Sequence, residues 1–159
     1  MWQPPKAVSL VAGSGEGSTE INAFDRALQT AGIANINFLR VTSILPPRTR
    51  VIELPPYPPG LLVPAVYARI ASTRRGDRIS ATIGIGISRE SYGVIMEHVA
   101  NTPRGEAEAA VRSMVEEGFR IRGLRLDEII VAGAEHTVER AGCAVAVALF
   151  WPAPTGLAC

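Results

Sequence analysis

The segment from Ile79 to Val99 reads ISATIGIGISRESYGVIMEHV, and its pattern sets the expected fold. Residues 79–87 alternate strictly, as in a strand that buries one of its faces. A second such run follows at residues 92–99, after the short polar stretch 88–91. Two alternating runs joined by a short polar connection are typical of a β-hairpin. The chain is therefore expected to contain an antiparallel sheet.

Two glycines and a helix extend this expectation. Gly84 and Gly86 stand inside the first strand, where glycine indicates that another backbone approaches closely. Residues 104–122 place apolar side chains at helical spacing along one side, which predicts a long helix. Two last strands are expected at residues 127–137 and 141–151, joined by a tight turn.

The N-terminal half adds a strand, a helix and a second strand. Residues 6–12 are typical of a buried strand, and GSGEGS at residues 13–18 is expected to be a flexible loop. Ser18 or Thr19 can cap a helix that ends at Gly32. Residues 35–42 alternate again and predict a second strand.

The segment from residue 46 to residue 64 is crowded with prolines, and it is expected to be an ordered but irregular loop. The whole pattern is βαβ, then this loop, then ββαββ. Two main helices against mainly antiparallel strands predict the α+β class, as an αββα sandwich.

Composition limits the classes of function. A chain of 159 residues with 47% hydrophobic residues is expected to form one domain, 1–159. Its formal net charge of +1 gives no case for nucleic acid or an acidic membrane as a partner. Only 19% of residues are charged, which hints that some surface is buried against other subunits.

Neither of the two cysteines has metal-ligand spacing with the two histidines, so no metal site is expected. Cys143 lies in an apolar run, and Cys159 is the last residue. A reduced, cytoplasmic setting fits this use of cysteine. The longest apolar run, from Ala141, is about half of what a bilayer span needs.

Two carboxylates are candidates for chemistry. Asp25 falls on the edge of the apolar stripe of the first helix, either as an ordinary boundary residue or as an anchor for a cationic ligand group. Glu97 shares a strand face with Ile95 and Val99. Among aliphatic side chains a carboxyl resists ionisation and is a usable general acid. The alternative is an edge strand from which Glu97 reaches solvent.

The sequence also contains one candidate phosphate-binding motif and one candidate nucleophile, and neither matches a known template. GSGEGS matches neither the Walker loop nor the dinucleotide fingerprint in the spacing of its glycines, and phosphate binding stays a minor alternative. Ser43 is a candidate nucleophile in RVTSILPP (residues 40–47), but no Ser-His-Asp order and no G-x-S-x-G elbow accompany it. Hydrolase chemistry is not favoured.

The sequence resembles pyruvoyl-dependent arginine decarboxylases over nearly its whole length. The resemblance is carried by VSLVAGSGEGSTEINAFDRAL (residues 8–28), AGIANINFLRVTSILPP (residues 31–47) and GVIMEHVA (residues 93–100). Members of that family use no pyridoxal phosphate, and each builds its own cofactor from a serine. The resemblance implies that the Ser43 hydroxyl attacks the carbonyl of Thr42 and that the chain then splits into residues 1–42 and 43–159. Ser43 would become a covalently bound pyruvoyl group.

The same resemblance implies the reaction and the roles of the other residues. The pyruvoyl ketone would form a Schiff base with arginine, and loss of carbon dioxide would yield agmatine, a polyamine precursor. Glu97 matches the proton donor, Asp25 the acid that holds the guanidinium, and Asn37 a residue implicated in self-processing. Family members are trimers, sometimes stacked into hexamers, with sites between subunits.

Three further features bear on this implied function. Asn37 lies six residues before Ser43, roughly 20 Å along an extended strand, so the chain must bend or a neighbouring subunit must supply Asn37. Thr42 stands where many relatives carry serine, which should not block attack on its carbonyl. Two rival functions are a pyruvoyl decarboxylase for another amino acid and an unprocessed, non-catalytic trimer that serves as a binding or scaffold protein.

Overall fold

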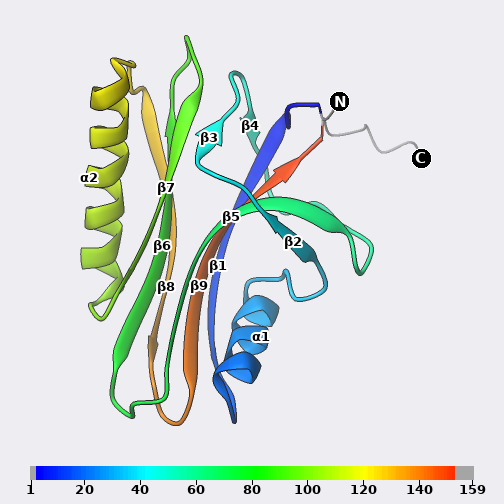
Figure 1. Ribbon diagram of the computed structural model, residues 1–159, viewed down its shortest axis with the longest axis vertical. Coiled ribbons are helices and arrows are strands. Elements are labelled where there is room, and N and C mark those ends of the chain that lie inside the picture. The colour runs from blue at the N-terminus through cyan, green and yellow to red at the C-terminus, as the bar shows by residue number, and fades with distance from the viewer. Residues whose placement is uncertain (1–2, 153–159) are drawn as a thin grey trace.

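The computed structural model describes residues 3–152, and these residues form four layers. Figure 1 shows the layers edge-on: α2, a four-stranded sheet, a five-stranded sheet and α1. The predicted αββα sandwich of mainly antiparallel strands with two main helices is confirmed. Apolar clusters fill the space between the two sheets and the space between each helix and its sheet.

The five-stranded sheet has the order β2-β5-β9-β1-β4. At its centre, β9 (Gly142–Trp151) runs antiparallel to both β1 (Ala7–Glu16) and β5 (Leu62–Ser72). Short parallel pairs complete the two ends: β2 (Asn37–Arg40) lies beside β5, and β4 (Arg50–Val51) lies beside β1. Although β1 comes from the start of the chain, it is therefore an interior strand.

The four-stranded sheet has the order β3-β7-β6-β8. The predicted hairpin is confirmed as β6 (Arg78–Ile87) and β7 (Gly93–Ala100), and β8 (Glu128–Thr137) pairs with the other side of β6. Strand β3 (Ile44–Leu45) pairs only with the start of β7. Beyond that point, from Met96 onward, β7 has no strand neighbour on this side among residues 3–152.

The two faces of β6 explain its alternation. Ile79, Ile83 and Ile85 are fully buried in the cluster that joins the two sheets. Glycines occupy the opposite face, and a Cβ atom on Gly86 would clash with the ring of Phe119 in α2. A close approach at the strand glycines is confirmed, but it is made by side chains of α2, among them Val115 and Phe119, and not by another backbone.

Both helices begin and end as their sequences indicate. Thr19 caps α1 (Glu20–Thr30), with its Oγ1 accepting a hydrogen bond from the Asn22 N–H at 3.3 Å. The longer helix α2 (Arg104–Arg122) ends at Gly123, whose φ of 63° lies in the left-handed region that favours glycine. No helix among residues 3–152 is long and apolar enough to cross a membrane.

The expected flexible loop at residues 13–18 is wrong. Residues 13–16 continue β1 and pair with β9. Glycine is needed there for packing rather than for flexibility, because a Cβ atom on Gly13 would clash with the α1 backbone at Ala27 and Ala31. Because residues 13–16 are part of a strand, they do not form the loop that the phosphate-binding alternative requires.

The sequence does not predict β5, which begins inside the proline-rich segment 46–64. Pro64 is the third residue of the strand and stands opposite Leu39 of β2, just before the pairing with β9 begins at Ala65. Near the start of a strand the missing N–H of proline removes little of the ladder, so the strand tolerates it. Residues 52–61 are irregular as expected.

The chain crosses from one sheet to the other after β2 and again after β8. The predicted strand 35–42 is confirmed only over β2, because the chain leaves the five-stranded sheet after Val41 and enters β3 in the other sheet. The predicted strands 127–137 and 141–151 are confirmed as β8 and β9, but the two belong to different sheets. The turn between them therefore also crosses from sheet to sheet.

Candidate active site

Residues 41–43 form the crossover from the five-stranded sheet to the four-stranded sheet. The last hydrogen bond to the five-stranded sheet is donated by the Val41 N–H to the Ala65 carbonyl at 3.0 Å. The first tie to the second sheet is the Ser43 carbonyl, which accepts from the Ile95 N–H at 2.8 Å. The peptide link between Thr42 and Ser43 thus lies between two anchored ends. In Figure 1 this crossover is the segment between β2 and β3.

The side chains at this crossover are accessible. Thr42 is exposed and Ser43 is half-buried. Within residues 3–152 the Ser43 hydroxyl has no hydrogen-bond partner, so it is not committed to a structural role. A free hydroxyl beside an exposed peptide link is what an attack on the preceding carbonyl requires.

Glu97 lies two residues beyond Ile95 on β7, on the same face of the strand. Its expected enclosure among aliphatic side chains is not found, since its side chain remains 35% exposed. Instead, Glu97 Oε1 forms an ion pair of 2.6 Å with Nη2 of Arg40, the last residue of β2. The structure is closer to the second alternative, a strand edge from which the carboxylate reaches solvent.

Arg40 has a second contact on its other side. Its guanidinium carbon lies 4.8 Å from the centroid of the Tyr67 ring, within cation–π range. Tyr67 in turn packs against Phe38, with 5.7 Å between ring centroids. The guanidinium is therefore placed between an aromatic ring on β5 and a carboxylate on β7.

An open pocket of about 440 Å³ surrounds this ion pair. It lies between β5 and β7, and it is lined by residues 67–69 and 97–99 together with Arg40. Among these lining residues Arg40 and Arg69 bring two positive charges and Glu97 one negative charge. Because positive charges outnumber the negative one, these lining residues alone do not supply an acidic group to hold a cationic substrate.

The other two candidate residues lie elsewhere on the chain. Asn37 is exposed at the start of β2, and its amide donates to the Gly60 carbonyl at 3.2 Å. Asp25 is exposed on α1 and accepts a hydrogen bond from Gln29 Nε2 at 2.8 Å. Within residues 3–152 neither side chain contacts Ser43 or Glu97 through a hydrogen bond or an ion pair. One chain thus brings together the Thr42–Ser43 link and Glu97, but not Asn37 and Asp25.

Sequence reasoning misses Arg40 and Tyr67. Arg40 stands three residues before Ser43, and the sequence pattern identifies it only as a polar position in a strand. Nothing in the sequence reveals its partner 57 residues away. Tyr67 belongs to β5, the strand that the nearby prolines conceal. The alternation around AVYARI (residues 65–70) is the signal that points to it.

Comparison with known proteins identifies the family. The model of the pyruvoyl-dependent arginine decarboxylase family matches residues 7–154. The chain belongs to this family. The pyruvoyl-dependent arginine decarboxylase of Methanocaldococcus jannaschii is 48% identical over 149 residues, which is 92% of this chain and 90% of the relative. The enzyme of the same name from Pyrococcus horikoshii is 44% identical over 155 residues, 95% of this chain and 98% of the relative.

Membership in the pyruvoyl-dependent arginine decarboxylase family extends over the whole candidate site. The matched residues include Asp25, Asn37, the Thr42–Ser43 link and Glu97. They also include both sheets that the crossover joins. The likeness therefore concerns a complete domain rather than one motif.

Proposed function

We propose that this chain is a self-processing pyruvoyl-dependent arginine decarboxylase that converts L-arginine to agmatine and carbon dioxide. The observation that carries the proposal is the place of Ser43 at the crossover, with a free hydroxyl and with Glu97 two residues beyond its β7 anchor. Family membership supplies the reaction, and the enzyme is a carbon–carbon lyase.

The pyruvoyl group is made from Ser43, so the fit depends on how the chain holds that residue. The hydroxyl attacks the Thr42 carbonyl, and the amide becomes an ester. Elimination then releases residues 1–42 with a carboxylate at Thr42 and leaves a dehydroalanine at position 43. Water hydrolyses this group to the pyruvoyl ketone, and the nitrogen of residue 43 leaves as ammonia. Val41 stays bonded to Ala65 and Ser43 to Ile95, so both ends of the cut are held in their sheets. When formed, the group supplies a carbonyl that withdraws electrons as the bond to the substrate carboxylate breaks.

The chain's own residues complete the chemistry. Loss of carbon dioxide leaves an electron pair on the substrate α-carbon, and Glu97 delivers a proton to that atom. Its partial exposure lets the carboxyl take up another proton from water for the next turnover. Asp25 holds the substrate guanidinium, whose planar fork matches a carboxylate. Asn37 assists the self-processing step.

Assembly brings Asp25 and Asn37 to the site in this proposal. The site forms between neighbouring subunits of a homotrimer, which stacks into a hexamer in some members of the family. Exposed apolar side chains around the crossover support an interface there: Leu39, Val41, Ile44 and Leu62 are each at least 37% exposed. A neighbouring subunit would also add an acidic group to the positively charged side of the pocket.

A cytoplasmic setting is part of the proposal. Cys143, the cysteine that lies within the described residues, is a buried free thiol. Burial raises its pKa, although the nearby Arg69 opposes the shift, and a thiol of this kind is held un-ionised and unreactive. Cys159 lies outside the described residues.

The proposed function is tested by comparing the purified chain with Ser43→Ala. The parent should give two bands on a denaturing gel, and its larger fragment should be lighter by one ammonia than the same fragment with an N-terminal serine. Arginine, lysine and ornithine should then be offered as substrates, with release of carbon dioxide as the readout. Ser43→Ala should stay intact and inactive. An intact, inactive parent would favour the scaffold alternative, and preference for another amino acid would favour the second decarboxylase.

A further inference from the structure

We propose that Arg40 is a positioning residue that fixes the Glu97 carboxylate for proton delivery. The inference rests on the proposed function, because it assumes that Glu97 is the proton donor. Arg40 itself touches no reacting atom in this account. It acts through Glu97, to which it is joined by the 2.6 Å ion pair.

The backbone of Arg40 is fixed by the five-stranded sheet. Arg40 stands opposite Ala65 in the parallel pairing of β2 with β5. The next residue, Val41, donates its N–H to the Ala65 carbonyl at 3.0 Å. The side chain therefore starts from an anchored strand, although it projects from the edge of the sheet.

The guanidinium is fixed a second time at its far end. The Tyr67 ring lies 4.8 Å from its central carbon, and Tyr67 is held in turn by Phe38. An arginine that stacks on an aromatic ring keeps its planar fork in one orientation. Because this orientation is set by β2 and β5, Arg40 can determine where a carboxylate on β7 comes to rest.

The ion pair closes a ring around the cleavage site. From Arg40 the chain runs through Thr42 to Ser43, whose carbonyl is bonded to the Ile95 N–H, and Glu97 follows two residues along the same strand. The Arg40–Glu97 contact joins the two ends of this path across the gap between the sheets. A carboxylate held in this ring stays near the residue that is converted to the pyruvoyl group.

The contact also distinguishes the two oxygens of Glu97. Arg40 engages Oε1, and within residues 3–152 Oε2 accepts no hydrogen bond from the protein. The proton that Glu97 delivers is therefore carried on Oε2. A group that holds one oxygen and leaves the other free sets the direction of proton transfer, which is a positional effect and not a contribution to folding.

The experiment compares Arg40→Gln, Glu97→Gln and the double variant, each in the full-length enzyme. The matched control is Arg78→Gln, because Arg78 and Glu135 form another ion pair between strands of nearly equal exposure, 54% and 33% against 59% and 35% for Arg40 and Glu97. A denaturing gel first measures the cleaved fraction of each variant, and steady-state rates are expressed per cleaved site.

Arg40→Gln should lower kcat by about 10- to 100-fold and change KM for arginine by less than about three-fold, because a misplaced group costs rate rather than substrate affinity. In the Glu97→Gln background the same change should alter kcat by less than about two-fold, since residues that act through one another are not additive. Arg78→Gln should match the parent. Full additivity, or a raised KM at unchanged kcat, would overturn the proposal.

A second measurement does not depend on activity. In crystals of the uncut Ser43→Ala protein, Glu97 should lie against Arg40, and the added Arg40→Gln change should displace or disorder the Glu97 carboxylate. If the carboxylate keeps its position without Arg40, the positioning role is wrong, even where the rates are low. If the parent neither cleaves nor decarboxylates arginine while this displacement is seen, the proposed function fails and with it the role in proton delivery, and only the placement of Glu97 by Arg40 stands.

Discussion

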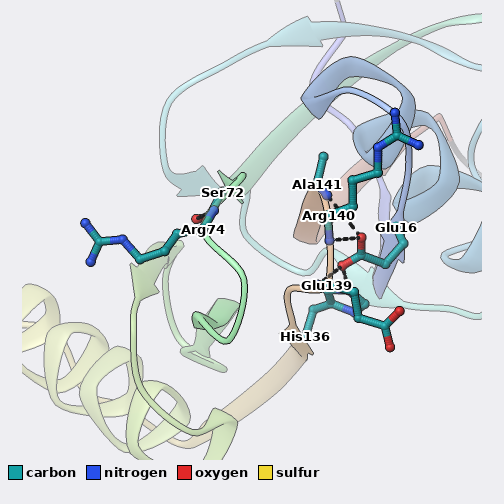
Figure 2. A network of polar contacts seen from close by, with 7 residues as sticks. All are labelled: Glu16, Ser72, Arg74, His136, Glu139, Arg140 and Ala141. Atoms are coloured by element: carbon teal, nitrogen blue, oxygen red, sulfur yellow. Dashed lines mark hydrogen bonds and ion pairs between the residues drawn. The ribbon is translucent and has the colours of Figure 1, made fainter.

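Glu16 at the end of β1 and His136 near the end of β8 meet beside the turn that joins β8 to β9, with Glu16 Oε1 2.6 Å from His136 Nε2. The same carboxylate accepts hydrogen bonds from the backbone N–H groups of Glu139 at 2.8 Å, and of Arg140 and Ala141 at 3.1 Å each. Figure 2 shows the Glu16 carboxylate surrounded by these donors. A residue of the first strand thus accepts hydrogen bonds from the backbone N–H groups of a turn that lies more than 100 residues later in the sequence.

Replacing Glu16 by glutamine should destabilise the fold in a pH-dependent way. Partial burial alone would raise the pKa of Glu16, but the hydrogen bonds from the Glu139 N–H, from His136 and from the next two N–H groups outweigh it and hold the pKa below its ordinary value. A carboxyl with a lowered folded-state pKa contributes stability above its unfolded-state pKa, and this contribution is lost as pH falls through the folded-state pKa. With allowance for its partial exposure, we expect Glu16→Gln to cost about 1 kcal/mol at neutral pH and less near pH ~3.

Urea unfolding at the two pH values, in the uncut Ser43→Ala background, measures this difference. Glu139→Gln is the matched control, because Glu139 lies in the same turn but contributes only its backbone N–H to Glu16. The control should unfold like the parent at both pH values. An equal loss in both variants, or a loss in Glu16→Gln that does not shrink with acid, would show that the carboxylate is not responsible.

The proposed cut should not separate the two fragments. Residues 1–42 include β1, which pairs over its ten residues with β9 and lies in the interior of the five-stranded sheet. Glu16 adds its contacts to residues 136–141 of the other fragment. Matured protein should therefore give two bands on a denaturing gel but one species by native mass spectrometry. Two separate species at neutral pH would contradict this expectation.

The sequence predicts most of the fold because its alternation and its glycines have simple physical causes. The β6–β7 hairpin, both helices and the two C-terminal strands follow from periodicity, since one face of each element must be buried. The glycines at residues 13–17 show the limit of such reasoning. Glycine permits both flexibility and close packing, and only the position of α1 over β1 decides between them.

The candidate site is predictable in part for a similar reason. Resemblance to a family proposes Ser43 and Glu97, and the structure places them near each other on the β7 edge. The partner of Glu97 was not predictable, because the Arg40 contact depends on how two sheets stack and not on any local pattern. In the proposed function, Asp25 and Asn37 reach the site only through a further step, the assembly of subunits, which no local sequence pattern encodes.

Gly13→Ala should test whether the glycines of β1 serve packing. The added methyl group would clash with backbone atoms of Ala27 and Ala31 in α1, which cannot rotate away as a side chain can. We expect a loss of about 1–3 kcal/mol in the free energy of unfolding, measured with urea in the uncut background. Gly105→Ala is the control, because a Cβ atom there meets nothing within 4 Å. Equal stability of Gly13→Ala and the parent would restore the interpretation as a flexible segment.

Asp25→Asn should reduce the preference of the mature enzyme for arginine over uncharged analogues. The reason is that Asp25 of a neighbouring subunit is proposed to hold the substrate guanidinium. Asparagine keeps the shape of the side chain and its contact with Gln29 but removes the charge that pairs with the guanidinium fork. We expect complete cleavage, and kcat/KM for arginine lower by about 10- to 100-fold, the worth of one charge-assisted contact. Turnover of citrulline, which is uncharged at the same position, should change far less, so the ratio of the two rates is the decisive measurement.

The control is Glu20→Gln, because Glu20 is another exposed acid on α1, and this change should leave the ratio of the two rates unchanged. If Asp25→Asn lowers both rates alike, Asp25 supports the assembly of the subunits rather than the recognition of arginine.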